Sequence, residues 1–140
     1  METVGAFLAE VLMEPGSISV NGGSNISVVA PEQNQLGQMM FRDNTKRMIG
    51  GQHVLILAGS INTGKTMLQA IDTAVYYGGN VCGVCAVFSA ATRVAGIDIH
   101  AIFTMREIPG YQVYPDHDCP LCRQGIKVDA IVNSYGYSGL

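Results

Sequence analysis

The pattern of apolar and polar positions predicts a strand, a helix and a second strand in the middle of the chain. Residues 54–57 are consecutive apolar residues, as in a buried strand. A glycine-rich turn is expected next, over residues 59–64. After it, apolar residues recur three and four positions apart, as in an amphipathic helix, at Met67, Leu68, Ile71, Ala74 and Val75. Gly78 and Gly79 are typical of a helix end. The apolar run 81–88 then resembles a strand from a parallel sheet covered on both faces, so we expect a right-handed βαβ unit.

Weaker patterns flank this unit. Apolar spacing over residues 7–12 predicts an amphipathic helix that ends at Pro15. Residues 18–20 and 26–30 are β-like and are separated by a turn signal, and residues 41–49 are typical of a short amphipathic helix.

Beyond the unit, residues 90–94 predict a short helix or turn, and residues 99–105 predict another strand. The expected fold class is therefore α/β with a parallel sheet. The length of 140 residues suits one domain, 1–140, in which 106–140 form a C-terminal extension.

Composition narrows the classes of function. The chain is 48% hydrophobic, carries a formal net charge of −3 and has no basic cluster, so we expect no nucleic-acid partner. No apolar run approaches the roughly 20 residues that span a bilayer, and the N-terminus lacks the layout of a signal peptide. These features predict a cytoplasmic protein with no membrane partner.

A strand, a glycine-containing loop and a helix start form the arrangement that binds phosphate. Backbone N–H groups point out of the first helical turn, and the helix dipole adds partial positive charge there. The residues expected to bind phosphate are Ser60, Ile61, Asn62, Thr63, Gly64, Lys65 and Thr66.

The same stretch matches the Walker A pattern G-x-x-x-x-G-K-[ST] at Gly59, Gly64, Lys65 and Thr66. In that interpretation Lys65 reaches the outer phosphates and Thr66 holds magnesium. A P-loop domain also needs an aspartate at the end of a neighbouring strand, but the 81–88 run is followed by Ser89. A small P-loop nucleotide-binding protein is therefore an alternative.

The stretch also resembles the phosphoribosyl pyrophosphate loop of type I phosphoribosyltransferases, in which four apolar residues, two acids and an apolar pair precede T-T-G-G-T or a variant. By this resemblance, residues 62–66 hold the 5′-phosphate of the ligand. The two acids that bind the ribose hydroxyls fall on Ala58 and Gly59, so the catalytic residues are unknown.

Two further segments resemble orotate phosphoribosyltransferases. Glu2, Thr3, Val4 and Gly5 are similar to the family's pyrophosphate-contacting loop, with Val4 in place of a glycine; the alternative for this segment is the start of the first helix. The D-C-P-L-C sequence near the C-terminus resembles the tail of a subset of these proteins. The resemblance implies a Rossmann-like type I phosphoribosyltransferase core that lacks part of the first strand and the hood.

The resemblance also implies the chemistry. Family members join a base to phosphoribosyl pyrophosphate with Mg²⁺, and they act as homodimers with basic residues near the leaving pyrophosphate. Here the acids are missing and no cation follows Ala30 before Arg42, which we interpret as part of a solvated face with Lys46 and Arg47.

These gaps predict a degenerate or weakly active protein of pyrimidine metabolism, with Mg²⁺ only if it is active. Its expected partner is phosphoribosyl pyrophosphate or another phosphorylated small molecule. An active orotate phosphoribosyltransferase that works with a partner chain is a further alternative.

The four cysteines form two C-x-x-C pairs, the spacing found in zinc sites. Cys82 and Cys85 lie in a predicted strand, where residues three apart point to opposite faces, and we interpret them as small core residues. Cys119 and Cys122 lie in a turn and would need either His117 with another group, or a second subunit, to complete a site. We therefore expect no metal site, and Cys119 and Cys122 are the only weak candidates.

Overall fold

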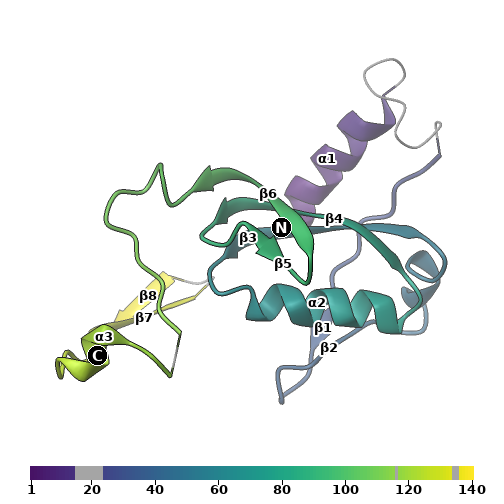
Figure 1. The fold of residues 1–140 in the computed structure, drawn as a ribbon. Helices are drawn as coiled ribbons and strands as arrows, with labels where there is room; N and C mark the ends of the chain where they lie inside the picture. Colours follow the sequence, from purple (N-terminus) through teal and green to yellow (C-terminus); the bar gives the residue numbers. More distant parts are fainter. Residues whose placement is uncertain (15–23, 116, 134–135) are drawn as a thin grey trace.

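A four-stranded sheet forms the centre of the molecule (Figure 1). The computed structural model describes residues 1–14, 24–115, 117–133 and 136–140. The sheet order is β3 (His53–Ile61), β4 (Asn80–Ser89), β6 (Ile97–Thr104) and β5 (Arg93–Val94). β3, β4 and β6 are parallel, whereas β5 is antiparallel to β6. The α/β class is confirmed, with a mixed, mostly parallel sheet that is compatible with a Rossmann-like core.

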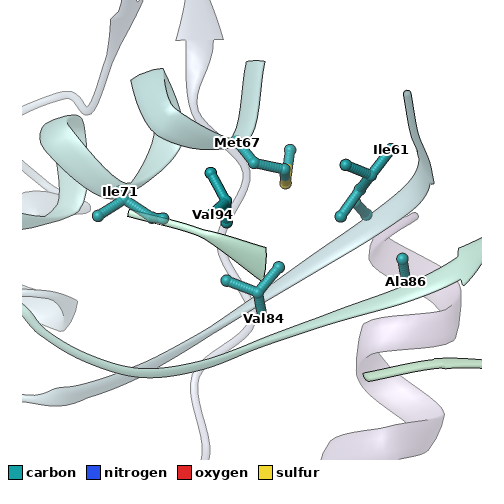
Figure 2. Close-up of a cluster of buried hydrophobic side chains, with 7 residues drawn as sticks. Ile61, Met67, Ile71, Val84, Ala86 and Val94 are labelled. Carbon is teal, nitrogen blue, oxygen red and sulfur yellow. The ribbon is translucent and has the colours of Figure 1, made fainter. Parts of the chain in front are cut away.

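The helix α2 (Lys65–Tyr76) connects β3 to β4 and packs on one face of the sheet (Figure 1). Its apolar stripe meets side chains from β3, β4 and β5 (Figure 2). The buried cluster consists of Ala58, Ile61, Met67, Ile71, Val84, Ala86 and Val94. Burying a large apolar side chain contributes about 1.5–3 kcal/mol, so this cluster holds the predicted βαβ unit together.

The predicted helix end at Gly78 and Gly79 is confirmed. Gly78 has φ 82° and donates its N–H to the carbonyl oxygen of Val75, while Gly79 donates its N–H to the carbonyl oxygen of Ala74, both at 2.9 Å. These two bonds satisfy carbonyl groups that the helix end would otherwise leave unpaired. A Cβ atom at Gly79 would lie 2.9 Å from side-chain carbons of Ile49 and Val54, so only glycine fits there without displacing them.

The first helix is also confirmed and is longer than its apolar spacing predicts, because α1 covers Glu2–Met13. It begins beside β3, on the side of the sheet away from α2 (Figure 1). A Cβ atom at Gly5 would lie 3.0 Å from Val28 and 3.8 Å from Leu57. Much of the outer surface of α1 is exposed and apolar, with Phe7 at 64% exposure.

Between α1 and β3, the structure differs from expectation. Residues 26–30 form no strand, and the predicted strand 18–20 lies outside the described residues. A small hairpin instead joins β1 (Glu32–Gln33) to β2 (Met39–Met40), and residues 41–49 contain only the 3₁₀ turn η1 (Lys46–Met48). The segments 26–30 and 41–49 were both too short for their local patterns to prevail over tertiary contacts. Arg42 pairs with Glu32, and Lys46 with Asp43, on the solvent surface.

After β4 the chain makes a second small hairpin. β5 and β6 are joined by Ala95 and Gly96, which have φ 48° and 80°, as in a two-residue hairpin turn. The predicted helix or turn over 90–94 is therefore wrong for its last two residues. Val94 decides this, because it is buried in the cluster under α2.

The C-terminal extension contains the single turn of α3 (Pro120–Arg123), then β7 (Ala130–Asn133) and β8 (Gly136–Gly139). The two strands pair with each other, antiparallel, and not with the central sheet. In the described part of the chain, no helix is long and apolar enough to cross a bilayer.

The core interpretation of the first cysteine pair is wrong for Cys82. The register of β3 on β4 shifts at this point, with Val54 opposite Val81 and Leu55 opposite Gly83. Cys82 is therefore an extra residue in a bulge. It is exposed, and its Sγ atom lies 3.4 Å from the carbonyl oxygen of Val54. Cys85 is partly buried, and this burial raises the pKa of its thiol.

Candidate phosphate-binding site

The loop between β3 and α2 is shorter than the sequence pattern suggests. β3 continues through Ile61, and both Ser60 and Ile61 pair with residues of β4. The predicted glycine-rich turn from Gly59 is therefore wrong at its beginning. Only Asn62, Thr63 and Gly64 separate the strand from the helix. The apolar pattern stops at Leu57, but pairing with the long strand β4 extends β3 beyond it.

The start of α2 is built on Gly64. This residue is the N-cap and has φ 81°, a left-handed conformation that favours glycine. Its carbonyl oxygen accepts the first helical hydrogen bond, from the N–H of Leu68 at 2.9 Å. No side chain caps this end, and no acidic residue occupies the first turn. The N–H groups of the first turn and the positive end of the helix dipole thus face the loop without a carboxylate in that turn.

A pocket of about 280 Å³ lies at this junction. Its lining includes every residue that the sequence predicted to bind phosphate, together with Met67. The lining residues are Ser60, Ile61, Asn62, Thr63, Gly64, Lys65, Thr66 and Met67. They bring together hydroxyl groups, an amide and one lysine. Within this lining there is no carboxylate, so its only full charge is positive. The volume is near the lower end of small-molecule sites, which measure about 300–1,000 Å³.

This geometry does not support the Walker A interpretation. In a Walker A loop, the residues between the two glycines leave the strand and surround the phosphates. Here the first glycine, Gly59, lies within β3, and the next two residues are paired to β4. The end of β4 also lacks a magnesium ligand, because Ser89 is buried and donates its hydroxyl to the carbonyl oxygen of Ala91 at 2.6 Å.

The two positions where the resembled family has acids face different surroundings. Ala58 is 6% exposed and belongs to the cluster under α2. Gly59 is exposed, and a Cβ atom on it would lie 3.5 Å from Sδ of Met1. A carboxylate at Ala58 would therefore enter the core in this chain. The local sequence pattern could not reveal this burial, because it depends on which face of β3 meets α2.

The segment expected to be a pyrophosphate loop has a helical conformation. Glu2, Thr3, Val4 and Gly5 form the first turn of α1, with the N–H of Gly5 bonded to the carbonyl oxygen of Met1 at 2.9 Å. The helix alternative is thus confirmed over the loop. The contact between Met1 and Gly59 nevertheless brings the start of α1 close to the last residues of β3. A role of these four residues in binding pyrophosphate stays a prediction.

Tyr111 is a site residue that the sequence analysis missed. Its hydroxyl donates to Oδ1 of Asn62 at 2.5 Å, and its ring packs edge-on against Phe88 with 4.9 Å between centroids. These contacts place residues near 111, from the beginning of the C-terminal extension, beside the loop and the end of β4. The two hydrogen-bonded residues are 49 positions apart. The only sequence signal was an aromatic residue in a proline- and glycine-rich turn.

A second hollow, of about 340 Å³, lies over the outer side of α2. Gln38, Met39, Gln69, Asp72, Thr73, Tyr76 and Tyr77 line it. It is larger than the loop pocket, but it contains none of the predicted site residues. Its lining contains the acidic residue Asp72 and no lysine or arginine, which is unfavourable for phosphate, so the smaller pocket is the candidate site.

Comparison with known proteins identifies distant relatives of this chain. No family model matches the chain. Orotate phosphoribosyltransferases from different strains of Thermus thermophilus are 30% identical to it over 83 residues. The matched segment covers 58% of this chain and 43% of each relative, so the chain spans less than half the length of these curated proteins. The similarity indicates a distant relationship to the phosphoribosyltransferases.

Proposed function

We propose that this chain is a phosphoribosyltransferase-like protein that binds the 5′-phosphate of a phosphorylated ribose, such as phosphoribosyl pyrophosphate, in the pocket between β3 and α2. One observation carries the proposal. All seven residues predicted to hold the phosphate line a single pocket at the N-terminus of α2. The distant similarity to orotate phosphoribosyltransferases supports the choice of ligand.

The pocket suits a phosphate for physical reasons. Backbone N–H groups of the first turn of α2 and the side chain of Lys65 supply positive potential, and the pocket lining contains no acidic side chain. A helix N-terminus stabilises a nearby anion by about 0.3–1 kcal/mol, and by up to about 2 kcal/mol where the site is partly buried. Thr63 and Thr66 add hydroxyl donors. Asn62, held by Tyr111 through its Oδ1 atom, keeps its amide N–H₂ for a ligand.

The same pocket is poorly equipped for catalysis. Glycosyl transfer to a base develops positive charge on the ribose and negative charge on the leaving pyrophosphate, and an enzyme must stabilise both. The lining contains neither a carboxylate for the ribose nor a second basic residue for the pyrophosphate. Mg²⁺ is usually held by one or two carboxylates together with substrate phosphates, so the residues present do not form a magnesium site. We therefore propose ligand binding with at most weak orotate phosphoribosyltransferase activity.

The test is a titration of the full chain with ribose 5-phosphate, in which binding is measured by calorimetry or by ³¹P NMR. The decisive variant is Gly64→Val, because a β-branched residue does not tolerate φ 81° and the loop must move. We expect at least a tenfold loss of affinity, equivalent to about 1.4 kcal/mol. The matched control is Gly37→Val. Gly37 has a similar φ of 75°, but it lies in the β1–β2 hairpin.

Three outcomes are informative. No binding of ribose 5-phosphate by the unmodified chain would refute the proposed site, as would equal affinity in both variants. Turnover of orotate and phosphoribosyl pyrophosphate with Mg²⁺ by the unmodified chain, at rates ordinary for an enzyme, would replace the degenerate interpretation with an active transferase. ATP hydrolysis that disappears in Lys65→Ala would favour a P-loop protein instead.

A further inference from the structure

The two C-x-x-C pairs have the same spacing but different local structures. Cys82 and Cys85 lie in the strand β4. Cys119 is the N-cap of α3, with φ −101° and ψ 113°, and Cys122 lies in the single turn that follows. The N–H of Arg123 bonds to the carbonyl oxygen of Cys119 at 3.2 Å, which closes this turn. The same C-x-x-C motif therefore adopts two different conformations in this chain.

The conformation decides whether the two sulfur atoms of a pair can meet. Along an extended strand, Cα atoms three residues apart are separated by about 10 Å. A disulfide requires Cα atoms within about 7 Å. In a helical turn, residues three apart have Cβ atoms about 5–6 Å from each other. Pro120 follows Cys119 at the first helical position, where its restricted φ favours the turn. The turn that holds the second pair is therefore more favourable for a disulfide bond than the strand that holds the first.

The surroundings of Cys119 suit a reactive thiol. Hydrogen bonding from the backbone and the thiol of Cys122 lowers the pKa of Cys119, and the Leu121 N–H and the Arg123 guanidinium lower it further. Arg123 and Asp118 lie beside the pair and form an ion pair with each other at 3.2 Å. The hydrogen bond to Cys119 raises the pKa of Cys122, which is the more exposed of the two thiols.

We propose that Cys119 and Cys122 form a dithiol site that exchanges with disulfides of low molecular weight, of which glutathione disulfide is the model substrate. The thiolate of Cys119 attacks one sulfur of the disulfide, forms a mixed disulfide and releases one glutathione thiolate, which takes up a proton. Cys122 then loses its proton and attacks the sulfur of Cys119, which releases the second glutathione. Two protein thiols are oxidised to one disulfide, and one glutathione disulfide is reduced to two thiols.

The other chemistry open to two neighbouring thiols is metal binding. A structural zinc site needs four ligands. Among residues 1–14, 24–115, 117–133 and 136–140, the structure contains no group of three or more histidine, cysteine, aspartate or glutamate side chains arranged to hold a metal ion. The exchange of two thiols for one disulfide needs no third residue, so it uses only groups that the turn already brings together.

The experiment uses the reduced full chain, incubated with mixtures of glutathione and glutathione disulfide and then alkylated. Mass spectrometry of the intact chain and of its peptides identifies which thiols have reacted. We expect a single disulfide between Cys119 and Cys122, while Cys82 and Cys85 remain alkylated. Cys122→Ser should accumulate a mixed disulfide at Cys119. Cys119→Ser should form no disulfide within the turn, so that Cys122 can only form a mixed disulfide with glutathione.

The first pair serves as the matched control. The double variant Cys82→Ser with Cys85→Ser should form the Cys119–Cys122 disulfide at an unchanged glutathione ratio. Four alkylated cysteines at every ratio would overturn the proposal, and so would equal oxidation of both pairs. Stoichiometric Zn²⁺ that protects Cys119 and Cys122 from alkylation, in a chain that forms no disulfide, would overturn it in favour of a metal site. None of these outcomes depends on phosphate binding.

Discussion

The central βαβ unit and the C-terminal hairpin are held by different interactions. Val84 in β4 is fully buried beneath α2, whereas Val132 in β7 is 75% exposed and its strand pairs only with β8. The phosphate loop belongs to the first region, so its shape depends on side chains brought together from distant parts of the chain. The cysteine turn precedes the hairpin in the C-terminal extension, where adjacent residues alone create the chemistry. A substitution far along the chain should therefore disturb the loop more readily than the turn.

The largest expected effect distinguishes two neighbours on β3. Ala58→Glu places a carboxylate in the apolar cluster under α2, which should reduce the free energy of unfolding by about 3–5 kcal/mol. Gly59→Asp places a carboxylate on the exposed side of the strand and should change it by less than about 1 kcal/mol. Urea unfolding of both variants provides the measurement.

This result also bears on restoring the family's acids. The double variant Ala58→Glu with Gly59→Asp should be unstable and should gain no turnover of orotate and phosphoribosyl pyrophosphate. Wild-type stability of Ala58→Glu would mean that β3 does not turn this residue toward α2. The distinction between a buried core and an exposed C-terminal extension would then not hold for β3.

A smaller effect is expected when the same side chain is shortened in each region. Val84→Ala removes two buried methyl groups and should reduce the free energy of unfolding by about 2 kcal/mol. Val132→Ala makes the same chemical change on an exposed strand and should alter it by less than about 0.5 kcal/mol. If thermal or urea unfolding showed the same loss of unfolding free energy for both variants, the hairpin would be as tightly packed as the core.

The smallest effect concerns the hydrogen bond by which Tyr111 links the C-terminal extension to the phosphate loop. Tyr111→Phe removes the hydroxyl that bonds to Asn62 but keeps the ring on Phe88. A neutral hydrogen bond contributes about 1 kcal/mol, so the affinity for ribose 5-phosphate should fall about fivefold, with little change in stability.

Tyr114→Phe is the control, because the hydroxyl of Tyr114 bonds to Gln112 and not to the loop. The effect of Tyr111→Phe should disappear in an Asn62→Ala background, as expected for two residues that act as a pair. An undiminished effect in that background would show that Tyr111 acts on the ligand by another route.

The sequence alone determined the features that depend on nearby residues. Apolar spacing identified α2 and the two parallel strands around it, and Gly78 with Gly79 identified the helix end, because periodicity and capping are local. The glycine and lysine at the start of α2 indicated a phosphate site for the same reason. The Cys119 turn was likewise visible as a turn, although its hydrogen bonds were not.

Tertiary structure decided where the strands end and which faces they present. The extension of β3 through Ile61, the bulge at Cys82 and the burial of Ala58 all follow from the register of β3 on β4 and from the position of α2. None of these appears in a local pattern, because strand pairing joins residues far apart in the chain. The bond between Tyr111 and Asn62 spans 49 positions, and only packing of the folded chain could bring that hydroxyl to the phosphate loop.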